Sequence, residues 1–144
     1  MDLVYKLSLT LFSICVPFVF THGENQKALI SFHKDIKPIF QANCNGCHQP
    51  AKMKGDYLMT EFVALLEGGE TGKIAIVPGK PEDSYLFDQI KLNEQGESEM
   101  PKGSKSKPLH PHQISKIEEW IKQGAKDDSP EGSNSLYSMV NKPV

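Results

Sequence analysis

Arginine is absent from this sequence of 144 residues, and all sixteen basic residues are lysine. They are matched by eighteen acidic residues, which gives a formal net charge of −2. A nucleic-acid-binding protein needs a basic surface that neutralises phosphates, and this composition has no such excess. We therefore expect no nucleic-acid partner. The length favours one small domain over two.

Long apolar runs are also lacking, apart from one near the N-terminus, which extends from Leu7 to Phe20. This run is shorter than the roughly 20 residues that a membrane-spanning helix needs, and it has the length of a signal-peptide core. Thr21 and Gly23 place small residues at the −3 and −1 positions of a cleavage site. We predict a signal peptide over residues 1–23, a periplasmic or otherwise extracytoplasmic location, and no membrane attachment after cleavage. A retained anchor is the alternative.

Cysteine is scarce, since only Cys15, in the leader, and the pair Cys44 and Cys47 are present. The pair belongs to Cys44-Asn-Gly-Cys47-His48, which is the C-x-x-C-H signature of covalent haem attachment. Two cysteines three positions apart can each bond one vinyl group of the porphyrin, and the side chain that follows is directed at the iron. We predict one covalent haem c held by Cys44, Cys47 and His48.

The cysteine pair has three other interpretations. A structural zinc site needs two more thiol or imidazole ligands at matching spacing, and the sequence has no second cysteine pair. A thioredoxin-like redox pair needs a βαβ context, whereas the flanks of Cys44 have a helical pattern. A disulfide of an exported protein remains the alternative, with His48 then incidental.

Helical periodicity predicts an all-α fold of about four short helices. With the haem motif near its start and an aromatic residue in its last helix, this arrangement resembles a small class I cytochrome c domain, which implies that the helices surround one haem. We expect the haem domain over residues 31–126 and a flexible tail over 127–144, where polar residues predominate. The first expected helix begins at a cap at Asp35, has Pro38 in its first turn and ends at Cys44, and the second runs from Glu61 to Glu67 after a cap at Thr60. The third runs from Pro81 to about Leu92. The fourth runs from Pro111 to Gly124, and its apolar stripe consists of Ile114, Ile117, Trp120 and Ile121.

Several further motifs follow one another along the chain. They are Phe32-His-Lys-Asp-Ile-Lys-Pro-Ile-Phe40, Gly68-Gly-Glu-Thr-Gly-Lys73, Ile76-Val-Pro-Gly-Lys-Pro-Glu82, Ser84-Tyr-Leu86, Met100-Pro101, Lys107-Pro-Leu109 and Ile117 to Ala125. With the C-x-x-C-H residues, this order resembles the planctomycete-type cytochrome c domain over roughly residues 32–126. The resemblance implies a covalent haem and a second iron ligand from the Met-Pro step, here Met100. Lys102 and His110 depart from the family pattern, which usually has a second proline and a small helix cap there.

The sixth iron ligand can also be considered from the residues alone. Methionine or histidine closes the iron in electron-transfer proteins, whereas haem enzymes leave that position open or labile. We predict Met100, because a polar loop gives little other reason for an apolar side chain and Pro101 stiffens its backbone. His110 or His112 is the rival, and an open site is the third possibility. The remaining candidates are Met53 and Met59, which follow His48 too closely to reach the opposite haem face, together with Met139 and His33.

The leading functional prediction is an exported monohaem c-type cytochrome that acts as a one-electron carrier rather than an enzyme. The alternative is a small haem enzyme, peroxidase-like, or a ligand sensor with an open or displaceable sixth ligand. The absence of arginine weighs against a peroxidase, because no guanidinium can stabilise charge at a distal site.

Three features of the sequence allow two interpretations each. Lys102, Lys105 and Lys107 form either a solvated loop or a cationic rim for an acidic redox protein of unknown identity. Tyr57 either lines the haem pocket or lies on the surface. The glycines Gly68, Gly69 and Gly72 are interpreted as turn residues, since a phosphate-binding loop would need a Walker-type lysine and a strand–glycine–helix unit.

Overall fold

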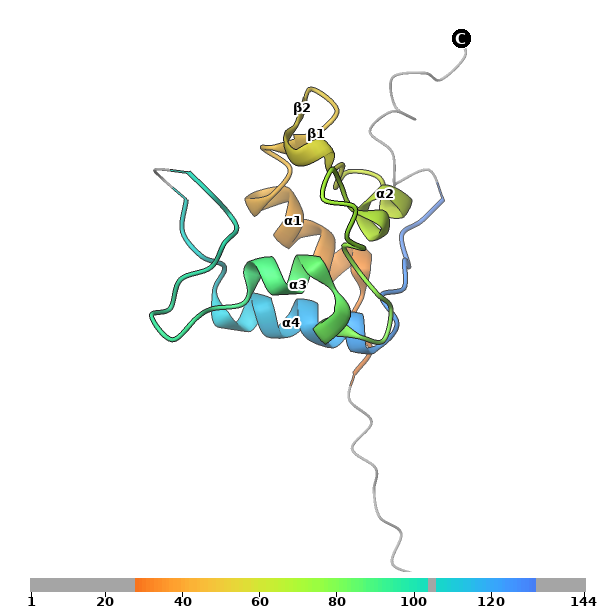
Figure 1. The fold of residues 1–144 in the computed structure, drawn as a ribbon. Coiled ribbons are helices and arrows are strands. Elements are labelled where there is room, and N and C mark those ends of the chain that lie inside the picture. Colours follow the sequence, from red (N-terminus) through yellow and green to blue (C-terminus); the bar gives the residue numbers. More distant parts are fainter. Residues whose placement is uncertain (1–27, 104–105, 132–144) are drawn as a thin grey trace, which may run out of the picture.

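The computed structural model describes residues 28–103 and 106–131. This part of the chain is rich in helix, as the sequence predicts, and Figure 1 shows its four α-helices. They are α1 (Lys37–Asn43), α2 (Phe62–Glu67), α3 (Tyr85–Ile90) and α4 (Pro111–Lys122). A π-helical turn, η1 (Phe32–Ile36), precedes α1, and two 3₁₀ turns, η2 (Lys54–Asp56) and η3 (Pro81–Asp83), precede α2 and α3.

The core lies around α4. Its predicted stripe of Ile114, Ile117, Trp120 and Ile121 is buried, and the helix packs against η1, α3 and η3. Phe32, in η1, stacks on Trp120 with ring centroids 5.3 Å apart. Burial of this stripe explains why so short a helix is stable, because helices of this length depend on packing rather than on intrinsic propensity.

The segment from Ile74 to Val77 joins the end of α2 to the start of α3. Ala75 N–H donates to Glu67 O and Ile76 N–H donates to Leu66 O, which satisfies two carbonyls that a helix end leaves without partners. On the other side, Tyr85 N–H donates to Ile74 O and Leu86 N–H to Ala75 O. The backbone of this one segment therefore completes the ends of two helices.

The first helical segment begins earlier than the sequence predicted. Ser31, not Asp35, is the cap: its hydroxyl accepts a hydrogen bond from Lys34 N–H at 3.0 Å. Asp35 lies within the first turn, and its carboxylate accepts from Ser31 N–H at 3.1 Å. The extra turn places Phe32 in the core, where it is 5% exposed, so tertiary packing decides where this helix begins.

Two other helix starts were also predicted wrongly. The helix expected from Pro81 to about Leu92 is interrupted at Ser84, whose buried hydroxyl accepts from Val77 N–H at 2.9 Å and donates to Lys80 O at 2.8 Å. A serine that bonds nearby backbone groups in this way competes with the helix. Thr60 does not cap α2, because its hydroxyl has no hydrogen-bond partner and Glu61 precedes the first helical residue.

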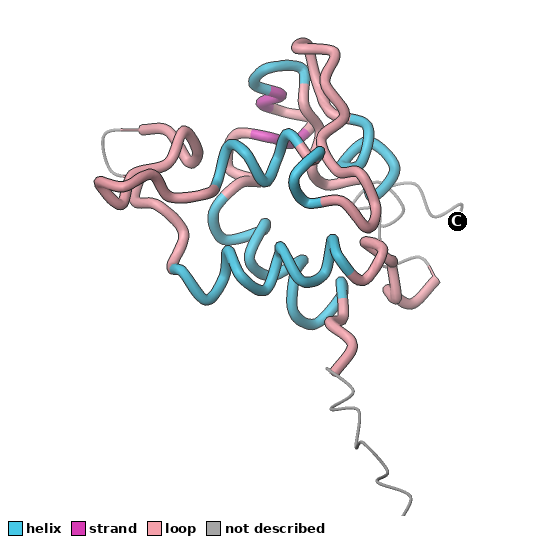
Figure 2. Tube along the Cα trace, turned by 60° about the horizontal axis from the view of Figure 1, so that its bottom comes forward, coloured by secondary structure: helices cyan, strands magenta, loops and turns pink. Residues whose placement is uncertain are grey.

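A small hairpin was not predicted. Strands β1 (His48–Gln49) and β2 (Lys52–Met53) pair antiparallel, with His48 opposite Met53, and Figure 2 shows them beyond the end of α1. Two residues per strand are too few to give the alternating pattern by which a strand is recognised in a sequence.

The end of the described chain, from Lys126 onward, makes specific contacts with the core of the fold. Trp120 Nε1 donates to Lys126 O at 3.0 Å, and His33 N–H donates to the Asp128 carboxylate at 2.9 Å. The predicted signal peptide, Cys15, Lys105, Met139 and the tail from residue 132 onward lie outside the described residues. Within those residues no helix is long and apolar enough to cross a membrane.

Candidate functional site

The C-x-x-C-H residues lie at the C-terminal end of α1, where the chain forms a tight turn. Cys44 N–H still donates to Phe40 O at 2.8 Å, as in a helix. The Cys44 carbonyl then accepts from both Cys47 N–H at 3.0 Å and His48 N–H at 3.1 Å. One carbonyl thus fixes the spacing of the two thiols and the imidazole. Both thiols are free and half-buried, so no disulfide joins them.

The thiol of Cys44 has the character of a buried, protonated group. Burial raises its pKa to about 12, with a smaller contribution from Cys47 nearby. A thiolate that attacks disulfides needs the opposite shift. Among the described residues no group of three histidine, cysteine or acidic side chains is placed to hold a metal ion. The first observation argues against the dithiol interpretation, and the second argues against the zinc interpretation.

His48 is held by its backbone and by one ring nitrogen. Its carbonyl accepts from Met59 N–H at 3.0 Å, and its Nδ1 lies 3.3 Å from the carbonyl oxygen of Tyr57. A carbonyl can only accept, so Nδ1 is the donor in this contact, and in the neutral ring the lone pair then lies on Nε2. Histidines that bind metals almost always have their second nitrogen occupied in this way.

Tyr57 lies beside His48 rather than on the open surface. Their rings meet edge to face, with centroids 5.5 Å apart, and the Tyr57 hydroxyl donates to Leu65 O at 2.8 Å. Burial raises the pKa of Tyr57, which keeps the phenol protonated and able to donate. The sequence left the place of Tyr57 open, and it contains no local signal for the contact between its carbonyl and His48.

The donor set fits a covalently attached haem. It consists of two free thiols and an imidazole whose Nδ1 is already occupied, all within one short turn. These are the groups that form two thioether bonds and one bond to iron. Cys44, Cys47 and His48 are therefore the residues that would hold the haem.

Met100 lies in the loop that joins α3 to α4. It is half-buried and packs against the core. Its N–H donates to Gln89 O at 2.8 Å, and its carbonyl accepts from the Ser98 hydroxyl at 2.7 Å. Figure 1 shows that this loop leaves the helices on the side where α1 ends. The role of Met100 as an iron ligand remains a prediction.

Other candidate ligands have different surroundings. Met53 is 44% exposed and faces His48 across the hairpin, whereas Met59 is buried in the core. His110 caps α4 through Nδ1, which accepts from His112 N–H at 3.3 Å, and the Nδ1 atoms of the two histidines lie 2.7 Å apart. His110 therefore caps α4, although the family pattern usually has a small residue at this position.

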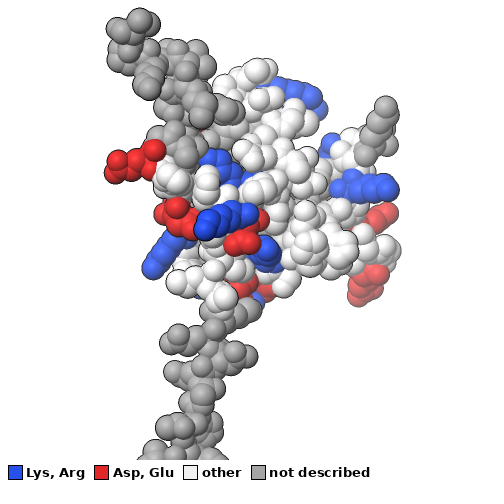
Figure 3. Space-filling model, turned by 180° about the vertical axis from the view of Figure 1, so that it is seen from behind, with Lys and Arg blue, Asp and Glu red and all other residues white. Residues whose placement is uncertain are grey.

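The lysines of the loop are only partly available as a cationic rim. Lys102 Nζ lies 3.1 Å from the Glu99 carboxylate, so an acidic neighbour offsets its charge. Figure 3, seen from behind, shows lysines and acidic residues mixed over the loop between α3 and α4, on the right of that view. A docking role for Lys102 and Lys107 remains a proposal.

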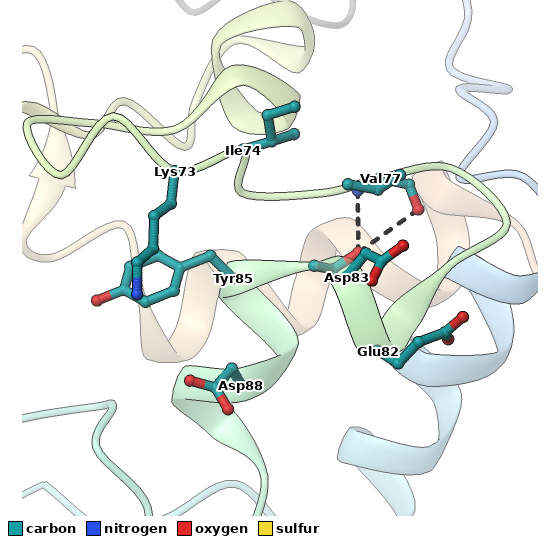
Figure 4. A pocket seen from close by; sticks show the side chains of 8 residues that line it. Lys73, Ile74, Val77, Glu82, Asp83, Tyr85 and Asp88 are labelled. Carbon is teal, nitrogen blue, oxygen red and sulfur yellow. Dashed lines mark hydrogen bonds between the residues drawn. The ribbon is translucent and has the colours of Figure 1, made fainter.

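A shallow groove of about 480 Å³ lies elsewhere, along η3 and the start of α3 (Figure 4). Lys73 Nζ sits 4.5 Å from the centre of the Tyr85 ring there. None of the C-x-x-C-H residues lines this groove, and neither does Met100. Its lining consists of Lys73, Ile74, Val77, Glu82, Asp83, Ser84, Tyr85 and Asp88.

Comparison with known families agrees with this geometry. Residues 44–103 match the planctomycete cytochrome C family. This confirms the resemblance seen in the sequence motifs. The matched segment begins at Cys44 and contains His48, the glycines Gly68 and Gly69, and Met100. No curated protein and no solved structure matches the chain.

Proposed function

We propose that this protein is an exported monohaem c-type cytochrome that carries single electrons, with His48 and Met100 as the axial iron ligands. One observation carries the proposal: the turn after α1 presents two free thiols and an imidazole with Nδ1 occupied, in C-x-x-C-H order. The match of residues 44–103 to the planctomycete cytochrome C family supports the same chemistry.

Each residue of the turn has a distinct task. The thiols of Cys44 and Cys47 would hold haem through thioether links, which would keep the cofactor attached even when the chain unfolds. His48 would offer Nε2 to the iron, and the contact of Nδ1 with the Tyr57 carbonyl favours the tautomer that this requires. When bound, haem c supplies a one-electron couple between ferric and ferrous iron.

Met100 distinguishes a carrier from an enzyme. A thioether sulfur is a neutral, polarisable ligand, and methionine as second axial ligand raises the reduction potential. Two hydrogen bonds tie the Met100 backbone to Gln89 and Ser98, which limits where its side chain can go. We propose that this loop closes the sixth position and leaves no site for a substrate.

Export is part of the same proposal. Covalent haem attachment takes place outside the cytoplasm, and the apolar leader over residues 7–20 has the length of a signal-peptide core. Fractionation of cells should recover the protein beyond the cytoplasmic membrane, without residues 1–23 and soluble. Recovery with Met1 intact in the membrane fraction would show that the leader is an anchor.

Mass spectrometry tests the attachment. The denatured mature chain should exceed the mass of its polypeptide by one haem after extraction with acidified acetone, because thioether bonds survive that treatment. A matched chain with Cys44→Ala and Cys47→Ala should show the polypeptide mass alone. Loss of all haem from the wild type would refute covalent binding.

A further inference from the structure

Several contacts near His48 are not used by the attachment itself, and they converge on Tyr57. We propose that Tyr57 is a positioning residue: clamped between Gly69 and the end of α2, it fixes the ring of His48 and so sets the reduction potential of the iron. This inference rests on the proposed function, because it concerns the iron ligand that the function requires.

We call Tyr57, together with its contacts to Leu65 and Gly69, the clamp. It contacts His48 through the backbone and the ring of Tyr57. The carbonyl of Tyr57 lies 3.3 Å from His48 Nδ1, and the two rings meet edge to face. Met59 N–H also donates to His48 O, so the chain from residue 57 to 59 runs alongside the histidine. A carbonyl that accepts from Nδ1–H makes Nε2 more basic, and a more basic ligand favours ferric iron.

The side chain of Tyr57 is anchored to α2. This helix has four C-terminal carbonyls that no later turn of helix can satisfy. Three of them accept from backbone N–H groups, those of Gly68, Ile76 and Ala75, but Leu65 O accepts from the Tyr57 hydroxyl at 2.8 Å. Leu65 is fully buried in the core. The hydroxyl therefore completes a helix end and, at the same time, ties Tyr57 to the core.

The backbone of Tyr57 is held from the other side by Gly69. A Cβ on Gly69 would collide with the carbonyl oxygen of Gly55, and it would lie 2.9 Å from Tyr57 Cβ and 3.0 Å from Tyr57 N. Glu70 N–H donates to that same Gly55 carbonyl at 2.8 Å. Only glycine allows this approach. The sequence pattern indicated only a turn at Gly68 and Gly69. In the structure, Gly69 lies directly against the segment that orients His48.

The test compares two tyrosine-to-phenylalanine variants of the full chain loaded with haem. Tyr57→Phe keeps the ring but removes the anchor to Leu65, so the His48 contact should loosen and the potential should rise. At a fixed applied potential near the midpoint, the ratio of oxidised to reduced protein should fall about threefold or more, which is about 30 mV for one electron. Tyr85→Phe, in the groove of Figure 4, is the matched control and should leave the ratio unchanged.

A pair of glycine variants tests the backbone half of the clamp. Gly69→Ala should shift the ratio in the same direction, because the Gly55–Tyr57 backbone must move away from the new methyl group. Gly72→Ala is the control: Gly72 has a φ of 67°, but its Cβ would meet nothing within 4 Å. Alanine there strains only its own turn and should leave the potential as it is.

A second readout is the exchange of His48 Nδ1–H with deuterated solvent, followed by NMR. Protection in the wild type and faster exchange in Tyr57→Phe support the clamp. A variant that loses thermal stability but keeps the wild-type potential and exchange rate would show a purely structural tyrosine and overturn the inference. If Tyr57→Phe protein does not accumulate, the wild type decides: exchange as fast as that of an exposed imidazole overturns the clamp, and protection supports it.

Failure of the clamp and failure of the proposed function have different signatures. A wild type without covalent haem, or with open iron, refutes the function and the clamp together. A wild type that is a closed, low-spin cytochrome while Tyr57→Phe leaves potential and exchange unchanged refutes the clamp alone.

Discussion

The two segments that carry the proposed iron ligands are held very differently. The His48 segment is fixed by a turn at the end of α1, a hairpin, the carbonyl of Tyr57 and the close approach of Gly69. The Met100 segment lies in a polar loop, where two hydrogen bonds hold the Met100 backbone and an exposed ion pair joins Lys102 to Glu99. The His48 segment is thus held by contacts with several elements of the fold, whereas the Met100 segment is held by few. Loss of the iron ligand in the His48 segment should abolish the cofactor site, whereas loss of the ligand in the Met100 segment should change only its properties.

The largest effect should come from His48→Ala. Without the imidazole the iron loses its ligand on the rigid side, and the yield of haem protein should fall about tenfold or more. His112→Ala, an exposed histidine at the start of α4, is the control and should leave the yield unchanged. Absorbance of the haem per polypeptide measures the result. Equal yields for the two variants would show that His48 is not the ligand.

Met100→Ala should keep the haem and change its properties. Loss of the thioether should remove the weak charge-transfer band at the red end of the visible spectrum, lower the potential and open the iron to carbon monoxide. Met53→Ala, on an exposed residue of the hairpin, is the matched control. Substitution of His110 and His112 together should change neither the band nor the potential. If that double variant loses the band and Met100→Ala keeps it, the sixth ligand is a histidine.

Substitutions in the His48 segment should also lower the free energy of unfolding more than substitutions in the Met100 loop. Tyr57→Phe leaves the carbonyl of Leu65 buried without its donor, which should lower the free energy of unfolding by about 1–3 kcal/mol. Glu99→Gln in the loop breaks only an exposed ion pair and should cost less than about 1 kcal/mol. Urea unfolding of both variants measures the difference. A loop variant as costly as Tyr57→Phe would contradict the contrast between the two segments.

The smallest expected effect concerns acid. The hydrogen bond from Lys116 Nζ at 2.9 Å, followed by that from Ser31 N–H, lowers the pKa of Asp35 below its ordinary value of 3.8. A lowered folded-state pKa stabilises the protein above about pH 4, and this stability is lost as the pH falls through the folded value. Because the pair is partly exposed, the effect should stay within about 1 kcal/mol. In Asp35→Asn, the free energy of unfolding measured with urea should fall less steeply between pH 5 and pH 3 than it does in the wild type. An equally steep fall in both proteins would contradict this prediction.

The sequence was informative where a pattern is local. The C-x-x-C-H spacing identified the turn, and the stripe from Ile114 to Ile121 identified α4, because both depend on residues within one or two helical turns. The order of motifs identified the planctomycete cytochrome C resemblance, which the match over residues 44–103 confirms.

The sequence was not informative where a contact joins distant backbone groups. The Tyr57 hydroxyl meets Leu65 O only because α2 ends where it does, and Gly69 meets Gly55 only once the chain has folded back. Neither contact has a periodic signature. The helix starts at Ser31 and Ser84 were misplaced for a related reason, since burial of Phe32 and of the Ser84 hydroxyl overrides the local capping pattern.

We propose that the firmly held His48 segment and the less constrained Met100 loop together close the iron of a covalently bound haem. The most direct test is the absorption spectrum of the purified exported protein, oxidised and reduced, with and without carbon monoxide. We expect low-spin iron in both states, the weak red band when oxidised, and slow carbon monoxide binding when reduced. High-spin iron that binds carbon monoxide at once would contradict it and support an enzyme or a ligand sensor.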